Sequence, residues 1–207
     1  YRFDPEGAGS VIAEDTNQDT PYLNLHYPPS DIPKQARQLY RLNWLRLIPD
    51  ANYQPVEITP IDNPITHQPL DLSLSVLRSV SPIHLEYLKN MGVTASMSVS
   101  LIQDKKLWGL IACHHSSPKY MSYNTRTVCE FIGQVMSVEL ANKEAIEDID
   151  YKRLLKSLQT QFIEALSQAE HFLDGIVQLD SQLLSLANAT GAVICSRNQF
   201  VRIGETP

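Results

Sequence analysis

Two arginines in apolar surroundings, Arg46 and Arg78, have the chemistry to bind an anion. A guanidinium group keeps its charge in a protein, so an arginine near a core needs an anionic or strongly polar partner. An ordinary surface salt bridge to a carboxylate of the chain would meet that need. A ligand carboxylate is the alternative, because Ser96 and Ser98 present hydroxyl groups along a strand predicted to lie opposite.

Other polar and aromatic side chains fall on elements that should line the same cavity. They are Tyr1, Tyr27, Asp31, His84, Tyr87 and His114. Taken singly, such histidines are more often core or surface residues than ligands, and such tyrosines are core aromatics whose hydroxyl groups find a partner. The set therefore indicates a polar cavity and leaves its ligand open.

Motifs of the common enzyme classes are missing from the sequence. It has no G-x-S-x-G, no Walker glycine loop, no H-E-x-x-H and no tight acidic cluster for a divalent ion. Cys113, Cys129 and Cys195 are odd in number and far apart, which suggests neither a disulfide framework nor a zinc site. We therefore expect a chain without catalytic or metal-binding residues, in a reducing cytoplasm.

Composition limits the partners and the number of domains. A length of 207 residues with 43% hydrophobic residues suits one domain and part of another. The net charge of −6 offers no electrostatic attraction to nucleic acid or to anionic membranes. No apolar run approaches the roughly 18 residues that span a bilayer. Because the sequence has no initiating Met, we expect it to be part of a longer protein.

The first third of the chain is predicted to consist mainly of loops. Short strands are expected at 11–13 and 45–49, with a helix over 32–42 for which Asp31 is a candidate N-cap. A second helix is predicted over 75–90, ended by Gly92. Pro82 lies inside this segment and should end or kink the helix locally.

The remainder has clearer periodicity. Residues 95–102 alternate serine with apolar residues and pair with 107–115 across an Asp104-Lys-Lys turn, which predicts a hairpin. One long helix is predicted over 124–168, of the kind that connects domains or pairs with a copy of itself. A short helix near 172–187 and a hairpin over 191–195 and 200–204 indicate the start of another α/β domain.

Four stretches carry a resemblance to a known family. They are Tyr1-Arg-Phe-Asp, His26-Tyr-Pro-Pro-Ser-Asp-Ile-Pro, Tyr87-Leu-Lys-Asn-Met-Gly and Leu107-Trp-Gly-Leu-Ile-Ala-Cys-His-His. Together they resemble the bilin-binding GAF domain of phytochromes, the red/far-red photoreceptors. The resemblance implies an α+β fold: a GAF domain over 1–145 with a central antiparallel sheet flanked by helices, a long connecting helix over 124–168, and the start of a GAF-like PHY domain over 169–207.

The resemblance also implies roles toward a linear tetrapyrrole. Asp31 would lie under the pyrrole nitrogens, His84 would hydrogen-bond the pyrrole region, and His114 would reach the carbonyl of ring D. Tyr1, Tyr27 and Tyr87 would flank ring D, which rotates on light-driven isomerisation. The propionates would be held by Arg46, Arg78, Ser96 and Ser98, and Ile32 completes the cofactor-binding set.

The residue before His84 distinguishes branches of the family. Plant phytochromes and their close relatives have at this position the cysteine that forms a thioether with the bilin, and this chain has Ile83. Ser81-Pro-Ile-His is similar instead to the bacteriophytochrome branch, which binds biliverdin through a cysteine ahead of its PAS domain. The bilin is therefore expected to be biliverdin, and no cysteine of this chain is expected to attach it.

The implied function is that of a photoreceptor fragment in a signalling pathway. Isomerisation of the bilin would bias a PHY-domain element and the long helix, with the output carried through a homodimer to a domain such as the histidine kinase of a two-component system. Expected partners are the bilin, a second copy through the long helix, and PHY and output domains in cis. A GAF domain that binds another small ligand, such as a cyclic nucleotide, or that serves as a ligand-free dimerisation scaffold is the alternative.

Overall fold

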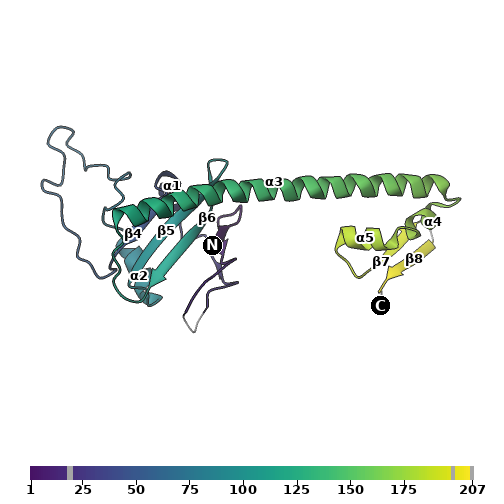
Figure 1. Ribbon diagram of the computed structural model, residues 1–207, viewed down its shortest axis with the longest axis horizontal. Helices are drawn as coiled ribbons and strands as arrows, with labels where there is room; N and C mark the ends of the chain where they lie inside the picture. Colours follow the sequence, from purple (N-terminus) through teal and green to yellow (C-terminus); the bar gives the residue numbers. More distant parts are fainter. Residues whose placement is uncertain (18–20, 197–198, 206–207) are drawn as a thin grey trace. The chain divides into compact units, whose positions relative to one another are not determined.

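A six-stranded antiparallel sheet organises Tyr1–Ala141, the first of two units in the chain (Figure 1). The computed structural model describes residues 1–17, 21–196 and 199–205. The strands are β1 (Arg2–Phe3), β2 (Gly9–Ser10), β3 (His26–Tyr27), β4 (Leu45–Ile48), β5 (Ala95–Gln103) and β6 (Lys106–His115), in the order β3-β2-β1-β6-β5-β4. The central antiparallel sheet is therefore confirmed, and β2 lies just ahead of the strand predicted at 11–13.

Strands β5 and β6 form the predicted hairpin. Their register runs from Ala95 opposite His115 to Gln103 opposite Lys106. Asp104 and Lys105 both have positive φ angles, of 48° and 61°, as expected for a two-residue turn that matches the twist of the strands. This long hairpin gives the first unit its most regular scaffold.

Two short helices depart in part from prediction. Helix α1 (Lys34–Leu42) has Pro33 at its N-cap without a side-chain hydrogen bond, so Asp31 is not the cap. Helix α2 (Pro82–Asn90) begins at Pro82, and the segment 75–81 ahead of it is irregular. Proline suits a first helical turn because its missing N–H has no partner there, and it disfavours helix in the residue before it. Arg78 therefore lies in a loop.

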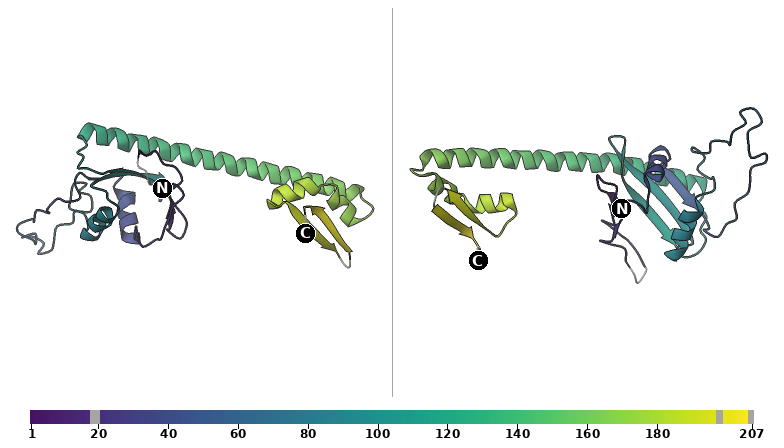
Figure 2. Two further views of the ribbon diagram at one scale, coloured as in Figure 1. Left: turned by 90° about the horizontal axis from the view of Figure 1, so that it is seen from below. Right: turned by 180° about the vertical axis from the view of Figure 1, so that it is seen from behind.

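Helix α3 (Tyr123–Gln168) confirms the predicted long helix and begins on one side of the sheet, with α1 and α2 on the other (Figure 2, left). It approaches β5 so closely that a Cβ at Gly133 would lie 2.5 Å from Val99 Cγ1. Ser137 Oγ accepts the Ile102 amide at 2.9 Å and donates to the Gly133 carbonyl at 2.7 Å. A core of Leu45, Leu47, Met97 and Val99, with Cys129 against it, fills this side.

The second unit, Asn142–Pro207, contains the end of α3 and a small α/β motif. Its elements are α4 (Phe172–Val177), α5 (Asp180–Ala187), β7 (Gly191–Ser196) and β8 (Gln199–Gly204). The predicted hairpin is confirmed, whereas the single helix predicted near 172–187 is divided, because the backbone of Leu179 (φ −116°, ψ 31°) leaves the helical region. Within the described ranges, no helix has the length and apolar character needed to cross a membrane.

Candidate functional site

Arg46 is the centre of a polar network on the side of the sheet away from α3. It lies opposite Ser98 in the register of β4 and β5. Its Nε and Nη2 donate to Ser98 Oγ at 3.1 and 2.8 Å, while Nη1 donates to Ser100 Oγ and to the Asn43 carbonyl. The guanidinium carbon lies 4.1 Å from the ring centroid of Tyr40. Arg46 is therefore held in one orientation by β5 and α1 together.

The oxygen atoms around Arg46 carry no formal charge. The ion pairs Lys152–Asp148 and Arg153–Asp150 lie on α3. Within the described residues, neither Arg46 nor Arg78 has a carboxylate within 4.0 Å. Burial lowers the pKa of Arg46 to about 10, which leaves it charged at neutral pH. Arg78 donates only locally, from Nη1 to the Ser75 carbonyl at 3.1 Å. A partly buried guanidinium with neutral partners has the charge and geometry to pair with an anionic ligand group.

His84 and His114 lie near this network. His84 is in the first turn of α2, and His114 is near the end of β6, opposite Ser96 in register. His84 is half-buried and His114 is more exposed, and desolvation lowers the pKa of both imidazoles. The charge of Arg46 lowers the pKa of His84 further, and His84 lowers that of His114. Near pH 7 both rings are therefore neutral, and each can accept one hydrogen bond and donate another.

These lowered pKa values predict a pH-dependent stability. The unfolded chain takes up protons at histidine near pH 6.5, whereas the folded chain binds them only at lower pH. The free energy of unfolding should therefore stay constant above pH 6.5. It should decrease as the pH falls from 6.5 toward the pKa values of the folded chain. Urea unfolding at pH 7.5 and about pH 5.5 measures the difference.

A double variant, His84→Asn with His114→Asn, should lose most of this pH dependence. His67→Asn, in an exposed loop, is the matched control and should keep it. An equal loss of stability at low pH in the double variant and in the unchanged chain would contradict the assignment.

A second cluster of polar side chains consists of Asp31 and three tyrosines, Tyr1, Tyr27 and Tyr87. The Tyr87 hydroxyl donates to Asp31 Oδ2 at 3.2 Å, and the rings of Tyr1 and Tyr27 lie 5.8 Å apart. Burial and then the Asp31 carboxylate raise the pKa of Tyr1 to about 12 and raise that of Tyr87. Tyr87 and His84 are three residues apart on α2, so this helix links the two groups.

Ile32 and Ile83 differ in their surroundings. The carbonyl oxygen of Ile32 accepts a hydrogen bond from Arg37 Nη1 at 2.6 Å. Ile83, at the start of α2, is 77% exposed. The structure thus gives Ile32 a backbone role, and it places Ile83 where its side chain contacts little of the described chain.

Sequence reasoning missed three residues that support this site: Tyr40, Ser100 and Arg37. Ser100 continues the serine alternation of 96 and 98, which is a signal that could have included it. Its Oγ also donates to the Tyr40 carbonyl at 2.6 Å, tying β5 to α1. Nothing in the local sequence indicates the contacts of Tyr40 or Arg37.

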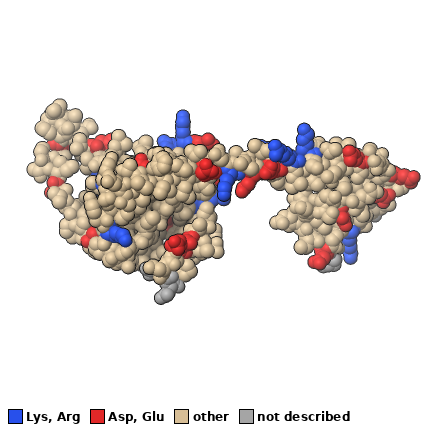
Figure 3. All heavy atoms as spheres, in the orientation of Figure 1, with Lys and Arg blue, Asp and Glu red and all other residues tan. Residues whose placement is uncertain are grey.

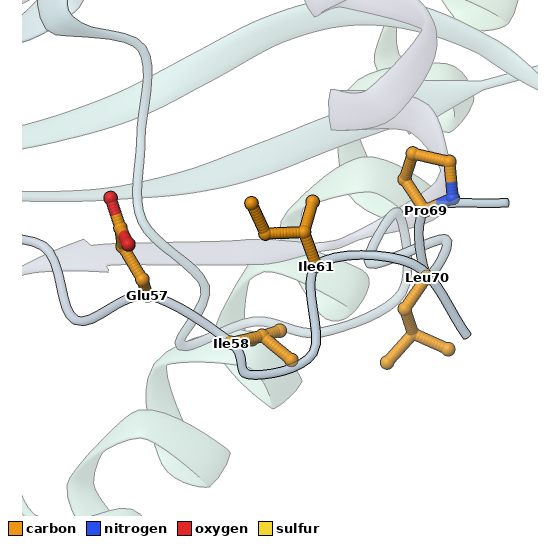
Figure 4. A pocket seen from close by; sticks show the side chains of 5 residues that line it. All are labelled: Glu57, Ile58, Ile61, Pro69 and Leu70. Carbon is orange, nitrogen blue, oxygen red and sulfur yellow. The ribbon is translucent and has the colours of Figure 1, made fainter. Parts of the chain in front are cut away.

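Two hollows in the first unit are lined mainly by other residues. One is formed within the long loop by Glu57, Ile58, Ile61, Pro69 and Leu70 (Figure 4). The other lies among residues 42–45 and 75–77 and the first turns of α3. Neither is lined by a residue of the predicted cofactor-binding set, so the candidate site rests on its contacts and charges.

Charge on the molecular surface is mixed. On the face seen in Figure 3, acidic and basic side chains alternate along α3, and the described residues show no extended basic patch there.

Comparisons with known proteins match both units. The family model described as GAF domain matches residues 11–142, and the one described as Phytochrome region matches 155–207. Cyanobacterial phytochrome B of Nostoc sp. is 53% identical over 100% of this chain and 28% of its own length. A bacteriophytochrome of Xanthomonas campestris is 40% identical over 100% of this chain and 33% of its own length. The chain thus spans about a third or less of these curated relatives.

Solved structures of similar proteins also superpose on the whole chain. A bacteriophytochrome from R. palustris superposes with a TM-score of 0.81 at 40% identity, covering 100% of this chain and 42% of its own. The photosensory core module of the Stigmatella aurantiaca phytochrome superposes with a TM-score of 0.74 at 52% identity, covering 100% and 41%.

Proposed function

The chain belongs to the phytochrome family, with a GAF domain followed by a phytochrome (PHY) region, and we propose on that premise that it is the light-sensing part of a red/far-red photoreceptor. We propose further that it binds a linear tetrapyrrole, biliverdin, on the side of the sheet away from α3. The observation that carries the proposal is Arg46: a partly buried cation with neutral partners, beside two histidines of lowered pKa.

The residues present fit such a ligand. Arg46, already oriented by Ser98, would pair with a propionate, and Arg78 could turn from its local carbonyl to a second one. Neutral His84 and His114 can exchange hydrogen bonds with pyrrole N–H and carbonyl groups. The bilin supplies the absorption of light and the double bond that isomerises. The chain supplies anion pairing, hydrogen bonds and an aromatic surround.

Signal output would use α3 and the PHY region. Several apolar residues of α3 are exposed in the first unit, among them Phe131 at 63% and Val128 at 56%. Such a stripe on a long helix favours pairing with the same helix of a second copy. We propose that the dimer and the PHY region pass the change of state to an output domain in cis, such as a histidine kinase.

Adding biliverdin to the purified chain tests the proposal. We expect strong absorption in the red, and reversible conversion by red and far-red light. A colourless, light-insensitive mixture would contradict it and favour the alternative of another small ligand or a ligand-free scaffold. Titration with cyclic nucleotides then separates those two.

Asp31→Ala should leave pigment binding largely intact and impair photoconversion. The carboxylate contacts the Tyr87 hydroxyl and not the Arg46 network, so its loss changes the group proposed to lie under the pyrrole nitrogens without removing an anion-binding group. Pigment stoichiometry and the photoconverted fraction are measured on the same sample. Tyr87→Phe, which removes the same hydrogen bond from the other side, should reproduce part of the defect. Complete loss of pigment from a folded Asp31→Ala chain would contradict this role.

A further inference from the structure

Arg37 binds three backbone carbonyl groups from two separate segments. Its Nη1 donates to Gly7 at 3.3 Å, to Pro29 at 3.3 Å and to Ile32 at 2.6 Å. The guanidinium also packs against the backbone of Gly7, where a Cβ would lie 2.6 Å from Nη2 and where φ is +95°. Glycine fits this turn on both counts. Helix α1 is thereby fastened to the β1–β2 turn and to the segment that follows β3.

The segment 28–33 needs such an anchor because it has no regular structure of its own. It follows β3 and precedes α1, and it contains no strand or helix. Within it, the Asp31 amide donates to the Pro28 carbonyl at 3.1 Å, which closes a single turn. The carbonyls of Pro29 and Ile32 that Arg37 binds stand on either side of Asp31. One side chain thus fixes the backbone at both ends of the Asp31 turn.

The contacts of Arg37 also connect α1 to the backbone near Tyr1 and Tyr27. Gly7 lies in the turn between β1 and β2, and β2 pairs with β3, which ends at Tyr27. Tyr1 packs across Gly9, where a Cβ would lie 2.0 Å from its hydroxyl. Arg37 therefore joins the backbone that carries Asp31 to the backbone that carries Tyr1 and Tyr27.

From this geometry we propose that Arg37 is a positioning residue, which sets the place of the Asp31 carboxylate relative to Tyr1, Tyr27 and Tyr87. Its own hydrogen bonds are to backbone carbonyl groups of the chain. Its consequence for light-driven chemistry rests on the proposed function, because that chemistry needs a bound bilin. The anchoring itself is a property of the chain without pigment.

The length and planar shape of arginine suit this task. All three carbonyls are bound by Nη1, which stands one bond farther from Cα than the ammonium nitrogen of lysine, and the guanidinium also packs against Gly7. Arg37→Lys should therefore recover only part of the anchoring, and Arg37→Met, which keeps the apolar stem, should recover none. Arg41→Met, one turn later on α1 and exposed, is the matched control.

Amide hydrogen exchange of the pigment-free 207-residue chain tests the anchoring. In Arg37→Met the Asp31 amide should exchange at least about tenfold faster, with β5 and β6 unchanged and Arg37→Lys intermediate. Unchanged exchange at Asp31 would overturn the proposal. Loss of protection throughout β5 and β6 would overturn it too, since Arg37 would then be a general stabilising residue.

A second experiment adds biliverdin to the same variants. Arg37→Met should bind pigment with the stoichiometry of the unchanged chain, and its photoconverted fraction should fall by about tenfold, as expected when a group near the reacting centre is misplaced. Full photoconversion would overturn the consequence for photochemistry. If the unchanged chain binds no pigment, the proposed function fails and hydrogen exchange alone decides the anchoring.

Discussion

Replacing Arg46 and Arg78 together by alanine should weaken biliverdin uptake by at least about 100-fold. A propionate moved from water into the site without a cation loses its hydration and gains no ion pair, at a cost of several kcal/mol per buried charge. Arg46 contributes more, because Ser98, Ser100 and Tyr40 already hold its guanidinium in place. Arg78, bonded only to its own loop, must reorient.

The single variants separate the two contributions. Arg46→Ala should lose most of the affinity and some stability, because it leaves the Ser98 hydroxyl and the Asn43 carbonyl without a donor. Arg78→Ala should lose less affinity and keep the urea midpoint of the unchanged chain. Arg41→Ala, exposed on α1, controls for net charge and should match the unchanged chain in both measurements. Equal pigment affinity in the double variant and the unchanged chain would mean that neither arginine meets the ligand.

Features set by local periodicity were predictable from the sequence. The β5–β6 hairpin follows from alternation on both strands and from a turn whose residues accept positive φ. Helix α3 follows from a helical period without proline over its 46 residues. The start of α2 was misplaced because apolar spacing ahead of Pro82 resembles a helix, while the proline ring acts as a boundary in the folded chain.

Contacts between distant segments were predictable only where a strand register determines them. Arg46 and Ser98 pair because β4 and β5 pair, and the alternation of serines gave the correct face. The packing of Tyr40 on Arg46 depends on where α1 lies over the sheet, which local sequence does not determine. Arg37 was missed for a related reason: its acceptors are backbone carbonyls, and every residue has one.

Asp31 shows how a local signal can indicate the wrong structure. An aspartate ahead of a helical pattern predicts an N-cap. In the fold Pro33 takes that position, and the Asp31 carboxylate turns instead to the Tyr87 hydroxyl, 56 residues along the chain. The local pattern thus predicted the wrong partner for this carboxylate.

Pigment bound to this chain should be released completely on denaturation. A thioether needs a thiol, readily converted to thiolate, close to the vinyl carbon of the bilin. Cys113 is next to His114 on β6, so the two side chains point to opposite faces, and Cys113 lies on the face of Met97 with α3. Although Cys113 is exposed, partial desolvation by its neighbours raises the pKa of its thiol, which disfavours the thiolate.

The other two cysteines are no better placed. Cys129 packs on α3 against the core that contains Leu45 and Val99, and Cys195 lies on β7 in the second unit. Neither stands next to His84 in the sequence, the place where the resemblance to plant phytochromes implies an attachment cysteine and where this chain has Ile83.

Zinc-induced fluorescence on a denaturing gel measures covalently bound bilin directly. The 207-residue chain should give no fluorescent band, and a variant with all three cysteines changed to serine should bind pigment as the unchanged chain does. A longer form of the protein with an upstream cysteine should give a band. A band from the 207-residue chain that disappears in Cys113→Ser would show that β6 supplies the attachment site, and the faces of β6 assigned here would then be wrong, because Cys113 could meet the bilin only from the side of Ser96 and His114.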